Sequence, residues 1–262
     1  MPVVGSLAAA SGQVRYAQAL HTREARTTMC GRIAQYKGVA AYLATLDSDA
    51  PILSGYDDIP LARYNVAPTS RVQVIREVVN GIVVAAVKWG WQPFWAVGRM
   101  PPPINARVET VAGGKYFKSI WPNRALVSAD GWYEWVHDPA NPKRKQPWFI
   151  RLRGGESMFM AAIGQFSHDG GEAGQSDGFV ILTADAKGGL LDIHDRRPIV
   201  LSPALAREWV AIDTTPERAQ DIVLNHALPA EAFEWYPVDR AVGNVRNEGP
   251  QLILPLDRGP GF

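Results

Sequence analysis

Apolar and polar residues alternate most regularly in two neighbouring runs, residues 71–79 and 82–91. A period of two is typical of half-buried β-strands, because successive side chains point to opposite faces of a sheet. The dipeptide Asn80-Gly81 separates the two runs. Asn-Gly between such runs favours a type I′ turn, so the pattern predicts a β-hairpin.

Five further segments are rich in apolar, aromatic and β-branched residues and are bounded by Gly, Pro, Asp or Ser, so each is predicted to form a short strand. They cover residues 124–136, 147–153, 157–166, 178–186 and 197–202. Between them lie two polar segments. Residues 137–147 are predicted to form a hairpin loop, and the glycine-rich residues 167–178 a flexible loop.

Helices are predicted for residues 38–46, 203–212 and 215–228. Pro203 directly follows Ser202, and Pro216 directly follows Thr215. A hydroxyl side chain at the N-cap followed by proline is typical of a helix start. Because strands outnumber helices without alternating regularly with them, the predicted fold class is α+β. We expect a mainly antiparallel sheet with a barrel-like core flanked by helices.

The composition excludes several classes of protein. The chain has 262 residues with 27 basic and 26 acidic side chains, so bulk charge does not indicate nucleic-acid binding. One cysteine excludes an internal disulfide, and the five histidines show no spacing typical of metal ligands. No apolar run is long enough to span a membrane. We therefore expect a cytoplasmic protein without metal or organic cofactor.

Residues 1–28 differ from the rest of the chain because they are Ala-rich and lack an apolar signal region. They could be a transit-like leader, a removable pro-segment, an unused upstream start or a disordered tail. Residues 29–262 are expected to form a single domain with a short C-terminal tail.

The single cysteine, Cys30, directly follows an internal methionine, Met29. If translation starts at Met29 and that residue is removed, or if residues 1–29 are cleaved, Cys30 becomes the amino terminus. An α-amino group titrates near ~7.7–8.0 and a thiol near ~8.5, so both are usable nucleophiles near neutral pH. Together they can close a thiazolidine ring on an aldehyde. The alternative is a small buried core cysteine.

Other polar residues lie in suggestive contexts: Glu134 between aromatic residues, Asn105 and Arg107 at alternate positions, and His194 before an apolar strand. Burial would raise the pKa of Glu134 toward that of a general acid or base. Each residue taken singly also has a structural explanation, as a surface acid, a helix cap or an ion-pair partner.

Taken together, the motifs resemble those of the SOS-response-associated peptidase (SRAP) family, the abasic-site processing proteins. The matching segments appear in the family's order and cover the chain from Met29 to about Pro255; they are MCGRIAQY, RYNVAPTS, WGWQPFW, INARVET, ALVSADGWYEWV, KQPWFI, FMAAIG, LLDIHDRRPIVLS and RAVGNVRN.

The resemblance implies that the protein senses abasic sites in single-stranded DNA and forms a reversible thiazolidine crosslink through Cys30, which protects the lesion during replication or the SOS response. Asn105 would position the terminal cysteine. Glu134 would serve acid–base steps, crosslink reversal and leader removal, and His194 would assist ring opening of the sugar. The implied activities are an autopeptidase and a lyase-type side reaction.

We expect three kinds of DNA contact: arginines that bind phosphates, aromatic rings that stack on bases, and polar residues in turns. Because every base can stack on a ring, these contacts would not select a sequence. The predicted set is Arg107, Arg196, Trp95, Trp91, Asn65 and Arg32. Within the aromatic cluster, which also includes Phe94, we expect Trp89 to be buried and Trp95 exposed.

Two alternatives come from other classes. The first is a cysteine peptidase acting on other proteins, with Cys30, His194 and Asn105 or Glu134 as a triad-like set. The second is a plain single-strand binding module, which would form no covalent adduct. We favour the crosslinking protein over the peptidase, because a cysteine at a flexible terminus is poorly placed to be a preorganised protease nucleophile. We also expect the protein to be a monomer.

Overall fold

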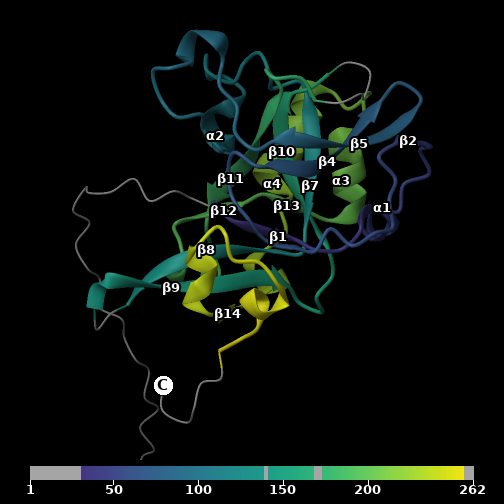
Figure 1. Cartoon of the computed structure of the whole chain (residues 1–262). Helices are drawn as coiled ribbons and strands as arrows, with labels where there is room; N and C mark the ends of the chain where they lie inside the picture. Colours follow the sequence, from purple (N-terminus) through teal and green to yellow (C-terminus); the bar gives the residue numbers. More distant parts are fainter. Residues whose placement is uncertain (1–30, 139–140, 168–172, 257–262) are drawn as a thin grey trace, which may run out of the picture.

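The computed structural model describes residues 31–138, 141–167 and 173–256, and within them two β-sheets lie one above the other (Figure 1). The smaller sheet has five strands in the order β14-β9-β8-β1-β3. Their bounds are β1 Ile33–Gln35, β3 Arg63–Val66, β8 Gly131–Asp138, β9 Asn141–Leu152 and β14 Phe233–Pro237. All pairs in this sheet are antiparallel.

The larger sheet contains nine strands among the described residues, with a main path of β12-β11-β10-β7-β4-β5-β2. On this path are β2 Ile52–Ser54, β4 Arg71–Val78, β5 Gly81–Lys88, β7 Arg124–Ala129, β10 Met158–Gln165, β11 Gly178–Asp185 and β12 Arg196–Pro198. Two short strands join from the side, β6 Asn105–Arg107 parallel to β11 and β13 Val200–Leu201 antiparallel to β10.

The α+β class with a mainly antiparallel sheet is confirmed, but the barrel-like closure is wrong. Each sheet keeps two open edges, β14 and β3 in one and β12 and β2 in the other. The edge strands β2 and β12 have only three residues each, too few to pair across a closing seam.

The helices of the described residues are α1 Val39–Leu46, α2 Val108–Val111, α3 Pro203–Val210 and α4 Pro216–Asn225. Three of them agree with the predicted segments, and the short α2 was not predicted. The side chains of Ser202 and Thr215 accept from the backbone amides of Leu205 and Arg218, so both are N-caps followed by proline. Short 3-10 turns cover 94–96 (η1), 188–192 (η2), 230–232 (η3), 240–243 (η4) and 250–253 (η5).

The β4–β5 hairpin is confirmed, but its turn is not the type I′ turn centred on Asn80-Gly81. Val78 pairs with Gly81, so Val79 and Asn80 are the central residues, and of these two only Asn80 has a positive φ, 78°. A type I′ turn needs positive φ at both. Gly81 is instead required by close packing, because a Cβ there would collide with the Pro51 carbonyl.

The run 124–136, predicted as one strand, is two strands in different sheets, β7 and β8, which meet at Asp130. The Asp130 carboxylate is 2% exposed and accepts from the Tyr42 hydroxyl at 2.7 Å and from the Tyr36 amide at 2.8 Å. The Lys37 amine lies 3.4 Å away. These contacts fix the corner where the chain passes from one sheet to the other.

We expect Asp130→Ala to lower the free energy of unfolding by roughly 2–4 kcal/mol, because it removes the acceptor of several buried or partly buried donors and the ion-pair partner of the half-buried Lys37. Urea unfolding followed by tryptophan fluorescence measures this change. Asp213→Ala, at an exposed aspartate, is the matched control and should stay within about 0.5 kcal/mol of the parent. An equally small effect at Asp130 would contradict the corner role.

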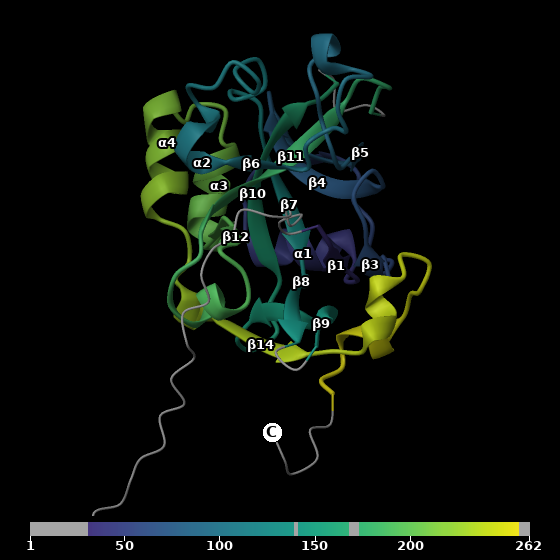
Figure 2. The same cartoon turned by 90° about the vertical axis from the view of Figure 1, so that its left-hand side faces the viewer.

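Apolar side chains form three clusters. Figure 2 shows the sheets and helices that contribute them. Ile33, Trp132 and Ile150 of the small sheet pack with Met160 and Ile181 of the large sheet in a core between the two sheets. On the other face of the large sheet, α1, α3 and α4 form a second core that includes Tyr42, Trp209 and Ile222. A third, smaller core containing Tyr133, Phe149 and Val242 covers the outer face of the small sheet.

Candidate functional site

Glu134 lies on the inner face of β8, toward the large sheet. Alternate residues of a strand share a face, so Glu134 projects on the same side as Trp132, which belongs to the core between the sheets. Glu134 is 3% exposed and stands opposite Trp148 of β9. A carboxyl group that is this buried is typical of a residue that takes part in proton transfer, whereas a surface carboxylate is usually exposed to solvent.

The register of β1 brings the beginning of the described chain to this carboxyl group. Ile33 pairs with Trp132, and the Tyr133 amide donates to the Arg32 carbonyl at 3.0 Å. Continued by two residues, this antiparallel register sets Gly31 opposite Glu134. Cys30, the predicted nucleophile, lies outside the described residues.

Asn105 and Arg107 come from β6, which runs parallel to β11 with Asn105 beside Ile181 and Arg107 beside Thr183. The strand is anchored at Ile104, whose carbonyl accepts from the Ile181 amide and from the Trp89 indole at 2.9 Å. Asn105 is half-buried and Arg107 is exposed. The alternate spacing therefore puts the amide side chain and the exposed cation on the same face of β6, with the cation reachable by a phosphate.

Arg196, at the start of β12, has a different environment. Its side chain is 6% exposed, and its guanidinium donates to both carboxylate oxygens of Glu109, to Asp185 and to the Thr183 carbonyl. Two carboxylates already neutralise this cation, and they raise its pKa against the opposing effect of burial. This placement does not favour the predicted phosphate contact. It favours a role in tying α2 and β6 to the end of β11.

His194 precedes Arg196 and lies almost buried, with its side chain 10% exposed. Its Nδ1 lies 3.0 Å from the Arg196 backbone amide nitrogen and 2.8 Å from an Asp195 carboxylate oxygen, so both neighbours hold the ring at this nitrogen. The pKa of His194 is lowered, first by burial and then by the charges of Lys145 and Arg196, while Asp195 opposes the shift.

We expect an NMR titration of the His194 ring to give a midpoint below about 6.5, the ordinary value for histidine. Asp195→Asn should lower the midpoint further, because Asp195 stabilises the charged ring. Since the folded-state pKa is below the unfolded value, the stability contributed by this group is present above pH ~6.5 and falls as the pH drops. A midpoint that rises in Asp195→Asn would contradict the assignment. Asp239→Asn, at a distant exposed site, serves as the control.

The aromatic cluster divides as predicted for Trp89, which is fully buried, and for Trp95, which is 46% exposed. Trp91, the other ring in the predicted DNA-contact set, is 4% exposed and packs against Tyr116. A ring enclosed in this way has no face on which a base could stack, so the structure does not support that contact. Phe94 is 89% exposed and is the most accessible ring of the cluster.

Arg32 and Asn65 form a buried pair on the outer face of the small sheet. Arg32 donates to the Asn65 side-chain oxygen at 2.6 Å and to the Val242 carbonyl at 2.8 Å, and its guanidinium lies over Trp135. The Asn65 amide in turn donates to the carbonyls of residues 244 and 247. Their burial, 9% and 2% exposed, does not favour the predicted DNA contacts and favours a supporting role. The motif at residues 240–247 was found from the sequence, but its contacts with these two side chains were not predicted.

Three features indicate the class of protein. The fold is α+β with two open sheets, a glutamate is buried beside the incoming chain, and an asparagine and a histidine lie on or next to strands that pair with β11. A family model described as SOS response associated peptidase (SRAP) matches residues 29–245. The chain belongs to the SRAP family. In the part of the chain that the structure describes, no helix is long and apolar enough to cross a membrane.

Several relatives are similar over most of this chain. The abasic site processing protein YedK of Escherichia coli is 45% identical over 229 residues, which is 87% of this chain and 100% of YedK. The chicken abasic site processing protein HMCES is 28% identical, covering 68% of this chain and 59% of HMCES. The crystal structure of a phage-related protein from Bordetella bronchiseptica has a TM-score of 0.67 and 38% identity, over 80% of this chain and 95% of that chain.

Proposed function

We propose that this protein processes abasic sites in single-stranded DNA by forming a reversible thiazolidine crosslink through Cys30, once that residue is the amino terminus. One observation carries the proposal: the β1–β8 register, which sets Gly31 opposite the buried Glu134. Since consecutive Cα atoms are about 3.8 Å apart, the residue before Gly31 is within one peptide unit of that position. The similarity to YedK along its full length supports the same function.

The reaction proceeds in three steps. The closed abasic sugar opens to an aldehyde when a base removes the proton of the anomeric hydroxyl and an acid protonates the ring oxygen. The α-amine of Cys30 adds to the aldehyde carbon, and loss of water gives an imine. The thiol sulfur then bonds to the imine carbon, the thiol proton passes to nitrogen, and the five-membered ring is complete.

Glu134 and His194 are the residues that we assign to the proton transfers. Glu134 is buried beside the incoming chain, and the lowered pKa of His194 keeps its ring neutral near pH 7, so one ring nitrogen carries a proton to give and the other can accept one. Each well-placed acid or base typically contributes about 10²–10⁴-fold in rate. Asn105, on β6, would orient the amino terminus.

Arg107, Phe94 and Trp95 are the residues that we assign to the DNA itself. Arg107 is the exposed cation next to Asn105, and a phosphate contact there would be weakened by salt. Phe94 and Trp95 expose rings on which bases beside the lesion could stack. Such stacking contributes about 1–3 kcal/mol per base without selecting a sequence.

The segment before Cys30 decides whether the crosslink can form, because an acylated nitrogen cannot condense with an aldehyde. Either translation begins at Met29, or the segment is removed. We favour the first route. In the second, the Cys30 thiol would attack the preceding carbonyl with Glu134 as base, which is the autopeptidase reaction in this proposal.

The test uses protein that begins at Met29 and a fluorescent single-stranded oligonucleotide with one abasic site, separated on a denaturing gel. We expect a covalent band that disappears when the α-amine is acetylated and the thiol is left free. A reaction that survives acetylation would indicate a thiol that acts without the α-amine, as in a cysteine peptidase. The absence of a covalent band before and after acetylation would indicate a plain DNA-binding module. Either of those results would refute the proposal.

A further inference from the structure

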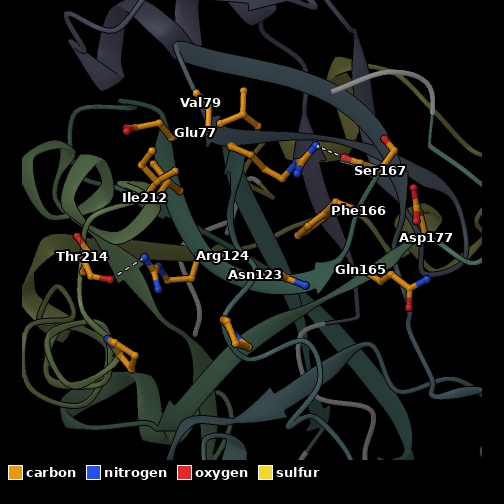
Figure 3. Close-up of a pocket in the computed structure, with 15 residues that line it drawn as sticks. Glu77, Val79, Asn123, Arg124, Gln165, Phe166, Ser167, Asp177, Ile212 and Thr214 are labelled. Carbon is orange, nitrogen blue, oxygen red and sulfur yellow. Dashed lines mark hydrogen bonds between the residues drawn. The ribbon is translucent and has the colours of Figure 1, made fainter. Parts of the chain in front are cut away.

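A cavity of about 860 Å³ lies where β4 ends and β7 begins (Figure 3). It is bordered by Gln165, which pairs with Gly178 at the first residue of β11, whereas Arg196 pairs with Asp185 at the last. At ~3.3 Å per residue, the two ends of β11 are roughly 23 Å apart. The cavity therefore lies at the opposite end of β11 from Arg196, whereas its lining residue Gln165 accepts from the Trp91 indole of the aromatic cluster at 3.4 Å.

The cavity occupies a split in the large sheet. Strands β4 and β7 pair only at Val74 with Val127 and at Ile75 with Leu126, although β4 continues to Val78 and β7 begins at Arg124. At one end of this short ladder the split is closed by the Gln35 side chain. Its side-chain nitrogen donates to the backbone carbonyls of Gln73 and Ser128, and its side-chain oxygen accepts from the Gln73 backbone amide. At the other end lies the cavity.

The contact with Gln35 also fixes the direction of the backbone groups. The amide and carbonyl of Gln73 point toward β7, and in an antiparallel strand every second residue repeats that direction. The backbone of Ile75 therefore bonds to Leu126, and the amide and carbonyl of Glu77 point into the cavity. This edge is a place where an extended main chain could pair.

Arg76 supplies an unused cation at the same place. The residue is 9% exposed, its guanidinium lies 4.6 Å from the centre of the Phe166 ring, and its Nη2 donates to the Ser167 carbonyl. Its buried Nε has no hydrogen-bond partner, and none of the described carboxylates lies within ion-pair distance of it. Burial lowers the pKa of Arg76, with only the nearby charge of Asp177 opposing. A buried cation with a free donor is stabilised by an incoming carboxylate.

The rest of the lining selects among anions. Val79 and Ile212 at the rim are 71% and 57% exposed, and Phe166 adds an aromatic wall (Figure 3). Arg124 is occupied by the carbonyls of residues 209, 211 and 214. Two acids, Glu77 and Asp177, also border the cavity and disfavour a polyanion such as a DNA strand. The lining fits a ligand with one carboxylate and an apolar side chain.

We propose that this cavity binds the C-terminus of a partner polypeptide that ends in an apolar residue. The terminal carboxylate bonds to Arg76, the last main-chain groups pair with Glu77, and the terminal side chain packs between Val79 and Ile212. A partner bound in this way would recruit the protein and would not cover Arg107 and His194, near the other end of β11.

The probe is a fluorescein-labelled pentapeptide, Ser-Gly-Ser-Pro-Phe, with a free C-terminal carboxylate, compared with its C-terminal amide by fluorescence anisotropy. We expect the free acid to bind at least about tenfold more tightly than the amide, the factor typical of one charge-assisted contact. Arg76→Met keeps the stem over Phe166 and should remove that difference. Ile212→Asp should weaken both peptides, and Arg153→Met, at an exposed arginine, should change neither.

Equal affinity for acid and amide, or no anisotropy change up to roughly millimolar protein, would overturn the proposal, as would displacement of the peptide by oligothymidylate. If Arg76→Met lowers the melting temperature, Ile212→Asp decides the question, because that side chain is on the surface. Both variants should crosslink abasic DNA like the parent. Loss of peptide binding with intact crosslinking thus separates this proposal from the function proposed above.

Discussion

Cys30→Ala and Cys30→Ser, made in the protein that begins at Met29, are expected to lose the denaturant-resistant adduct with abasic DNA entirely. Both variants keep the terminal amine and can still form an imine. Neither can close the sulfur-containing ring, and an open imine hydrolyses or eliminates the 3′ phosphate. The measurement is a denaturing gel that resolves adduct, intact strand and cleaved strand.

Sodium borohydride provides the control for this experiment, because it reduces an imine to a stable secondary amine. With borohydride present, Cys30→Ser should give a covalent band, which would show that the variant still binds and condenses. Without it, cut strand should accumulate, because the thiol normally suppresses the lyase reaction. A stable adduct formed by Cys30→Ala without reductant would contradict the thiazolidine proposal.

Glu134→Gln is expected to slow adduct formation by about 10²–10⁴-fold under single-turnover conditions, the usual contribution of one general acid or base. Glutamine matches glutamate in size and can still accept a hydrogen bond, so the buried position at 3% exposure should keep its packing. What is lost is the ability to take and return a proton. The rate should also lose the limb of its pH profile that reports this carboxyl group.

Glu217→Gln is the matched control for this prediction, since Glu217 is an exposed glutamate in the first turn of α4. It should leave the rate within about twofold of the parent. If Glu134→Gln reacted as fast as this control while Cys30 variants remained inactive, the proton transfers would have to be assigned elsewhere, with His194 the first residue to test.

Local patterns predicted the elements that depend on neighbouring residues. The β4–β5 hairpin and the starts of α3 and α4 follow from alternation and from capping residues within a few positions. The division of residues 124–136 between two sheets was missed, because Asp130 is fixed by Tyr36 and Tyr42, which precede it by 94 and 88 positions. No local pattern encodes contacts of that range.

The candidate site shows the same division. Motif resemblance selected Asn105, Glu134 and His194, and in the structure Glu134 is buried, His194 almost buried and Asn105 half-buried. The motif resemblance did not separate exposed residues, which a DNA strand could contact, from buried residues that support the fold. Arg32 and Arg196 are both arginines in matching motifs, yet their partners lie up to 210 positions away, and burial follows from those partners.

The network of Arg32, Asn65 and Val242 links the two extremities of the family match, since it ties the start of β1 to the segment 240–247. Arg32, two residues after the proposed nucleophile Cys30, is therefore held by a segment that is synthesised about 210 residues later. During synthesis, Cys30 and Arg32 would leave the ribosome well before the segment 240–247 that binds Arg32. If the proposed function is right, a chain that ends before this segment should crosslink abasic DNA poorly.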